Sequence, residues 1–192
     1  ALGDRAVIEA VAEAAGRFDV PLVVDPVMVA KHGAALVAPE AAQVLRDVLL
    51  PRATLVTPNA HEARWMCGFD IDGPARAVEA ARALAQLGPR AVLIKGGHVP
   101  GDEAVDVLWV DGEVHELSAP RVDTPHTHGT GCTYSAAITA RLAAGEPLLA
   151  AVSEAKSWLT EALRNAPGLG AGTGPVGHHT PLPRPSRLPP AG

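Results

Sequence analysis

The segment "DTPHTHGTGCTYSAAITARLAAG" (residues 123–145) combines residue types that could bind an anion and carry out chemistry beside it. Residues 129–132, which we call the glycine turn, stand before a run of small residues that predicts a helix. Glycines allow backbone N–H groups to converge, and the positive end of a helix dipole adds attraction for a phosphate. Gly129, Thr130 and Gly131 are therefore predicted to form an anion hole.

Cys132 ends the glycine turn, where a base would be wanted if a reaction followed. The helix start and the nearby amides favour a thiolate, which would make this side chain a competent proton acceptor. A covalent cysteine nucleophile with His128 is a second hypothesis, although no Asn or Asp is evidently set to orient that histidine. A third is packing, because a small and mildly apolar side chain suits the first turn of a buried helix.

These residues must be positioned by the elements around them, and helical and buried-strand patterns alternate along the chain. Helices are predicted at 4–18, 60–66, 74–87, 131–144 and 148–164, and another begins at Pro39. Buried strands are predicted at 20–25, 53–57 and 91–95. Asp111-Gly112 predicts a hairpin. Such alternation implies an α/β sandwich with a largely parallel sheet, and the three buried strands are expected to be adjacent or near-adjacent inner strands.

Ligands gather at the carboxyl ends of parallel strands, and the notable polar residues fall there. These are Asp25, Thr57, Asn59 with Glu62, Lys95 with His98, and the glycine turn, and we expect them to face one cleft. Each has a structural alternative: Asp25 suits a turn before proline, Asn59 and Glu62 suit a helix capping box, and a lysine often lies along a surface with its charge in water. As functional groups, the two carboxylates could hold Mg²⁺, and the glycines after Lys95 would admit a phosphate. His98 and His128 fit ordinary loop positions, and Cys67 fits packing.

Composition narrows the classes of function. The chain has 192 residues, 47% of them hydrophobic, and a net charge of −5 without a basic run, which argues against nucleic acid or an anionic membrane as a partner. It has no membrane-length apolar run and no signal segment, and its two cysteines form neither a disulfide framework nor a metal-ligand spacing. The expected compartment is the cytoplasm. One domain is predicted over residues 1–179, followed by a disordered Pro-rich tail at 180–192.

Six segments taken together, in order, resemble one family. They are "VVDPVMVAKHG", "LVTPNAHEA", "AVLIKGGH", "THGTGCTYSAA", "EAKSWLTEAL" and "GTGPVGHH". In this order they are similar to the hydroxymethylpyrimidine/phosphomethylpyrimidine kinases of thiamine biosynthesis, within the ribokinase-like superfamily. The resemblance runs to about His179. It implies a three-layer α/β/α fold.

The resemblance also implies a reaction and a set of roles. ATP would phosphorylate the hydroxymethyl group of 4-amino-5-hydroxymethyl-2-methylpyrimidine and then its monophosphate. The glycine turn would be the anion hole, with Cys132 as the base in place of the superfamily's usual Asp. Lys95, Thr57 and Asn59 would contact ATP, Asp25 and Glu62 would organise Mg²⁺, and Val27 would line the pyrimidine pocket. The expected partners are ATP, a small pyrimidine and a second copy in a homodimer.

Family members begin with further strands that carry a segment of the type "G-[ST]-D-x-x-G-G-A-G", so the resemblance implies a chain shortened at its N-terminus. Two other functions stay open. A pyridoxal kinase would share the reaction with a different ring, but that group normally keeps Asp where Cys132 stands. A non-catalytic protein that binds a nucleotide or pyrimidine would keep the nucleotide-binding scaffold without carrying out the reaction.

Overall fold

The computed structural model describes residues 2–29 and 35–183, which divide into two compact units. The first unit comprises residues 1–100 and 105–116, and the second comprises residues 101–104 and 117–192. Two predicted features fall partly outside the described residues: the "AKHG" stretch of the first family segment (30–33) and positions 184–192 of the tail.

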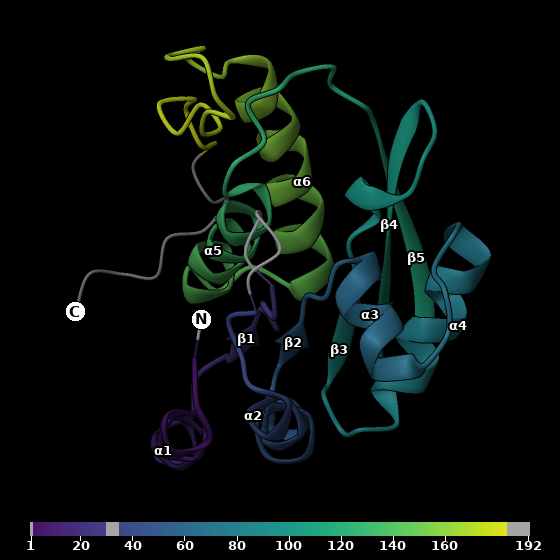
Figure 1. The fold of residues 1–192 in the computed structure, drawn as a ribbon, viewed down its shortest axis with the longest axis vertical. Coiled ribbons are helices and arrows are strands. Elements are labelled where there is room, and N and C mark those ends of the chain that lie inside the picture. Colours follow the sequence, from purple (N-terminus) through teal and green to yellow (C-terminus); the bar gives the residue numbers. More distant parts are fainter. Residues whose placement is uncertain (1, 30–34, 184–192) are drawn as a thin grey trace. The chain divides into compact units, whose positions relative to one another are not determined.

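The first unit contains most of a five-stranded sheet with the order β1-β2-β3-β4-β5 (Figure 1). Strands β1 (Val23–Val24), β2 (Leu55–Val56) and β3 (Ala91–Ile94) run parallel, and β4 (Glu103–Val110) is antiparallel to β3. β5 (Glu113–Pro120) follows β4 through a two-residue turn, in which Asp111 and Gly112 have φ of 52° and 85°. The predicted hairpin is therefore confirmed, since positive φ at both positions is what such a turn requires.

The sheet order corrects one expectation. The three apolar strands are adjacent, as predicted, but β1 is the end strand of the sheet rather than an inner strand among the described residues. Val24 is buried, whereas Val23 is only half-buried. An apolar run indicates that the faces of a strand are covered, but it carries no information about whether both edges are paired.

Helices of the first unit pack around one apolar core. They are α1 (Arg5–Ala15), α2 (Pro39–Val44), α3 (Ala60–Cys67) and α4 (Pro74–Ala85). Asp4 caps α1 by accepting a hydrogen bond from Val7 N at 2.9 Å, and proline opens both α2 and α4. α2 continues as a π-helical turn and a 3₁₀ turn over residues 45–52, which brings three leucines into the core: Leu45, Leu49 and Leu50.

The second unit is built on α5 (Thr130–Ala143) and α6 (Leu148–Arg164), which pack side by side (Figure 1). Both were predicted within one residue of their observed bounds. The buried residues of the two helices are mostly small or branched and include Ala137, Ile138, Ala151, Val152, Ala155 and Ala162. Small side chains allow the helix axes to approach closely. None of the helices in residues 2–29 and 35–183 is both long and apolar enough to cross a membrane.

Candidate active site

The first unit brings three predicted site residues to one edge of the sheet, because each follows the carboxyl end of a parallel strand. Asp25 follows β1, Thr57 follows β2 and Lys95 follows β3. Backbone bonds continue the register beyond the strands, from Thr57 N to Val24 O at 3.0 Å and from Lys95 N to Pro58 O at 2.8 Å. The alternation of buried strands and helices thus places these side chains on neighbouring strand ends.

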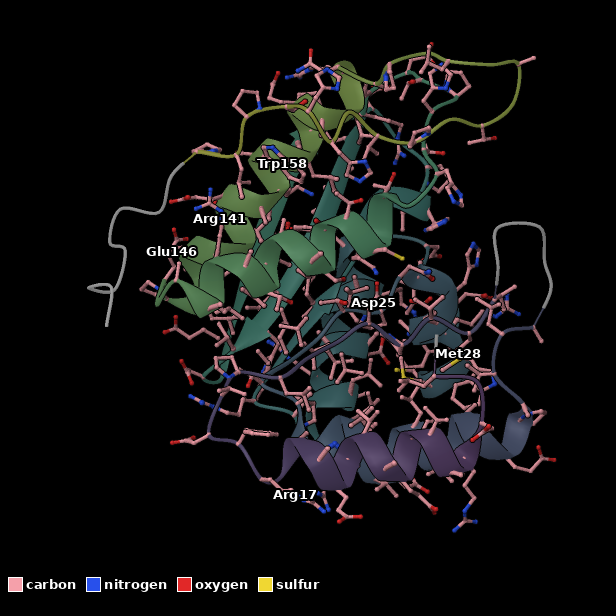
Figure 2. The ribbon with its side chains drawn as sticks, turned by 90° about the vertical axis from the view of Figure 1, so that its left-hand side faces the viewer. Arg17, Asp25, Met28, Arg141, Glu146 and Trp158 are labelled. Carbon is pink, nitrogen blue, oxygen red and sulfur yellow. The ribbon has the colours of Figure 1, made fainter. Side chains whose placement is uncertain are left out.

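Lys95 and Asp25 form an ion pair that the sequence did not predict. Nζ of Lys95 lies 2.9 Å from Oδ1 of Asp25, and the two side chains are only 10% and 15% exposed. In Figure 2, Asp25 is labelled on the segment that leads to Met28. The pair holds a lysine charge at the strand ends, where its partial burial strengthens the electrostatic interaction.

Asn59 and Glu62 form the capping box that was one of the two interpretations of their spacing. The Asn59 side chain accepts from Glu62 N at 3.0 Å, and Glu62 Oε2 accepts from Asn59 N at 2.7 Å. An isolated bridge also pairs Asn59 with Lys95. The cap therefore has a second consequence, because it orients a buried carboxylate next to the lysine.

Burial raises the pKa of Glu62 from its ordinary value of 4.5 to about 7. Lys95 and backbone hydrogen bonds from Asn59 and Met28 lower this pKa, while the charge of Asp25 raises it, but desolvation has the largest effect. Glu62 thus interacts electrostatically with both members of the ion pair. The three side chains form one charged cluster, which we call the acidic-lysine cluster (Asp25, Glu62 and Lys95).

The acidic-lysine cluster has the chemistry of a site for a hard divalent cation. Asp25 pairs with Lys95, and the effect of burial on the pKa of Glu62 outweighs the lowering effect of Lys95. Oxygen ligands in this number suit Mg²⁺, which is usually held by one or two carboxylates together with water and phosphate. Across the described part of the chain, no group of three or more His, Cys, Asp or Glu side chains could hold a metal ion by itself.

Sequence reasoning missed Asp106, which holds the loop after Lys95. Its Oδ1 accepts from Gly96 N at 2.8 Å, and the side chain lies buried on β4. A Cβ at Gly96 would lie 1.8 Å from Val105 O, so only glycine fits. The available signal was an acidic residue inside the apolar strand "AVDVLWV", which needs a buried hydrogen-bond donor.

The second unit contains the glycine turn. Gly129 has φ of 76° and stands immediately before α5, as the glycine pattern requires. Thr130 Oγ1 donates to Thr127 O at 2.8 Å, and Thr133 N donates to Gly129 O at 2.8 Å. In the part of the chain that the structure describes, the N–H groups of Gly131 and Cys132 donate no hydrogen bond. They are thus able to receive an anion.

The two cysteines differ in their surroundings. Cys132 is exposed, whereas Cys67 is half-buried and packs against the core with its Sγ 3.8 Å from Ala80 O. Burial raises the pKa of the Cys67 thiol, which disfavours the nucleophilic thiolate. Among residues 2–29 and 35–183, no histidine is hydrogen-bonded to Cys132, so the covalent hypothesis gains no His partner.

Three expectations about the site stay predictions. Val27 is half-buried and its N–H donates to Asp25 O at 2.8 Å, but its part in a pyrimidine pocket is untested. The convergence of the glycine turn with the acidic-lysine cluster is likewise untested. So are the catalytic and binding roles assigned to the individual residues.

Comparison with known proteins identifies the family. A family model described as phosphomethylpyrimidine kinase matches residues 1–177. The chain belongs to that family. It is 47% identical over 177 residues to the hydroxymethylpyrimidine/phosphomethylpyrimidine kinase of Synechococcus elongatus, covering 92% of this chain and 67% of the relative. It is 48% identical over 157 residues to the thiamine biosynthesis bifunctional protein ThiED of Geobacter sulfurreducens, covering 82% of this chain and 32% of that protein.

A solved structure supports the fold. The pyridoxal kinase of Staphylococcus aureus, in complex with AMP-PCP and pyridoxal, matches with a TM-score of 0.86 and 31% identity, over 94% of this chain and 65% of that one. The α/β, ribokinase-like class expected from the sequence is thereby confirmed. The chain spans about two thirds of the length of the Synechococcus elongatus and Staphylococcus aureus kinases.

Proposed function

We propose that this chain forms part of a kinase that transfers the γ-phosphoryl group of ATP to the hydroxymethyl oxygen of 4-amino-5-hydroxymethyl-2-methylpyrimidine. The same site would then phosphorylate the monophosphate, as a step of thiamine biosynthesis. Family membership supports the reaction class, and the acidic-lysine cluster is the observation that carries the proposal. We further propose a homodimer in the cytoplasm, which size-exclusion chromatography and fractionation would test.

Lys95 would bind the triphosphate by exchanging partners. Its ammonium group now pairs with Asp25, and phosphate oxygens offer stronger charge-assisted acceptors at the same edge of the sheet. The exchange would leave Asp25 and Glu62 as the ligands of Mg²⁺, directly or through water. Bound Mg²⁺ would supply positive charge against the phosphates. Thr57 and Asn59, beside these residues, would contact the nucleotide.

The glycine turn would receive the transferred group. Its Gly131 and Cys132 N–H groups would stabilise the negative charge on the equatorial oxygens during transfer. The sulfur of Cys132 would take the proton of the substrate hydroxyl while the oxygen attacks phosphorus and ADP leaves. In the second step the acceptor oxygen belongs to a phosphate, so little proton abstraction is needed.

The test uses the full-length protein with ATP, Mg²⁺ and three acceptors in parallel: the pyrimidine alcohol, its monophosphate and pyridoxal. Products are identified by ³¹P NMR. The proposal requires phosphorylation of both pyrimidines and loss of turnover when EDTA removes the metal. Binding of ATP without any phosphorylated product would favour the non-catalytic alternative instead.

Pyridoxal phosphorylation is the second candidate, and the similarity to a solved pyridoxal kinase favours including it. Against it stands Cys132, because the resemblance to the pyrimidine kinases implies Cys at this position and Asp in a pyridoxal kinase. A kcat/KM for pyridoxal above that for the pyrimidine alcohol would replace the first proposal with the second.

A further inference from the structure

The segment "GTGPVGHH" (172–179) has no role in the reaction proposed above, yet it is held against the glycine turn. Gly174 N donates to Nδ1 of His126 at 3.1 Å, and His128 N donates to Gly174 O at 3.0 Å. His128 and Pro175 also form an isolated parallel bridge. Two hydrogen bonds in opposite directions thus fix the chain immediately before the glycine turn.

A third contact reaches the first turn of α5. Nε2 of His178 lies 3.0 Å from Oγ1 of Thr133. Thr133 is the residue whose N–H closes the first helical ring onto Gly129 O, at 2.8 Å. The histidine therefore holds the side chain of the residue that closes the ring around Gly131 and Cys132, whose N–H groups would bind the phosphate.

The close approach depends on two glycines. A Cβ at Gly174 would lie 2.6 Å from Nδ1 of His126, and a Cβ at Gly177 would lie 2.3 Å from Asn165 O. Gly177 N also donates to Ala162 O on α6 at 2.8 Å. The backbone of this segment thus lies directly against the helix pair, with no side chain between them.

The segment continues along the helices to Pro183. Trp158 Nε1 donates to Thr180 O at 3.0 Å, and Arg141 Nη2 donates to Pro183 O at 3.1 Å. Figure 2 shows Trp158 beside this segment and Arg141 next to Glu146 farther along it. Arg141 is 1% exposed and is held by Glu146 at 2.8 Å, so it is a rigid support. We call residues 174–183 the C-terminal strap; its last four residues belong to the predicted tail, whose boundary stays a prediction.

We propose that the C-terminal strap positions the glycine turn for phosphoryl transfer, with His126 and His178 as the positioning residues. The expected effect on turnover rests on the proposed function, whereas the contacts between the strap and the glycine turn do not depend on it. Anion stabilisation requires donors placed within a fraction of an ångström, and the glycine turn has no side-chain cap of its own. The strap supplies this constraint on the glycine turn through the contact of His178 with Thr133. These two residues are about 45 positions apart in the sequence.

The experiment compares His178→Ala with His179→Ala in the full-length protein. His179 is the matched control because it is the adjacent exposed histidine and has no hydrogen bond among the described residues. Hydrogen exchange, followed by mass spectrometry, reports the first-turn amides of α5. We expect His178→Ala to accelerate their exchange about fivefold, the usual worth of one hydrogen bond. His179→Ala should leave it unchanged.

The kinetic arm separates positioning from folding. His178→Ala should lower kcat by about ten- to hundredfold, with KM for the pyrimidine within about twofold of the parent value. His178→Gln, whose amide nitrogen can occupy the place of Nε2, should restore most of the turnover. His126→Asn should be milder than His126→Ala, because its carbonyl oxygen still accepts from Gly174 N.

The outcomes distinguish the two proposals. If the parent protein phosphorylates no pyrimidine while His178→Ala still accelerates local exchange, the proposed function fails and the positioning inference stands. If His178→Ala and His179→Ala behave alike in exchange, the inference is wrong. Faster exchange throughout the chain together with a lower melting temperature would also overturn it, because the histidine would then be stabilising the whole fold.

Discussion

The ammonium nitrogen of Lys95 lies 2.9 Å from Oδ1 of Asp25, although 70 positions separate the two residues in the sequence. Parallel pairing of β1, β2 and β3 brings them together, because each residue follows the carboxyl end of its strand. The pair is largely buried and electrostatically coupled to Glu62. Each charge in this cluster therefore affects the stability and protonation of the others.

Lys95→Met should destabilise the protein by about 3 kcal/mol, because removal of one partner leaves the other charge in a partly desolvated place. The double variant Lys95→Met/Asp25→Asn should lose less free energy of unfolding than the sum of the losses of the two single variants. Urea denaturation measures both. Arg5→Ala, which breaks an exposed helix pair with Glu9, is the control and should cost at most about 0.5 kcal/mol. Strict additivity of the two site variants would contradict the coupling.

Stability in metal-free buffer should fall as the pH rises from about 4.5 to about 7, the window between the ordinary and the folded pKa of Glu62. The folded state holds the proton more tightly than the unfolded state, so unfolding becomes easier as the proton is lost. The full shift corresponds to about 3 kcal/mol. Urea denaturation over this range, with a chelator present, measures the slope.

Glu62→Gln provides the control for that slope. Glutamine can still complete the capping box, so the start of α3 is retained while the titrating group is removed. The variant should lose the pH dependence in this window. An equal slope in the parent and the variant would assign the dependence to other groups.

Gly96→Ala should cost several kcal/mol or prevent folding, because a Cβ there would meet Val105 O at 1.8 Å. Neither β3 nor β4 can move without breaking the ladder between them. Gly97→Ala is the matched control, since a Cβ at that position meets no atom within 4 Å. Thermal unfolding of the two variants checks the difference, and similar melting temperatures would count against the close backbone contact.

Cys132→Ala should leave ATP binding nearly intact and slow the first phosphorylation by roughly 10²–10⁴, the usual worth of a general base. The second phosphorylation should suffer less, because its acceptor phosphate is already largely ionised near neutral pH. Cys132→Asp, which carries the superfamily's usual base, should recover part of the first step if the carboxylate fits. The two steps are measured separately, with ATP binding followed by calorimetry.

Equal losses in both steps together with weaker ATP binding would mean that Cys132 only packs at the helix start. In that case the glycine turn would still act through its backbone, because its N–H groups do not depend on the cysteine side chain.

The sequence by itself determined the elements of this fold and their local chemistry. Buried apolar runs gave the strands, proline and helical spacing gave the starts of α2 and α4, and Asp111-Gly112 gave the hairpin. The capping box of Asn59 and Glu62 was also open to prediction, because its partners are three residues apart. Interactions of this kind depend on backbone conformation over a few residues, which residue types and spacing encode directly.

Only the tertiary structure decided which distant groups meet. Strand pairing joined Lys95 to Asp25 and placed Asp106 against Gly96, while the packing of the C-terminal strap on α5 brought His178 to Thr133. The position of β1 at the end of the sheet belongs to the same class. These contacts depend on register, sheet order and side-chain burial, and no local pattern specifies a partner that lies tens of residues away.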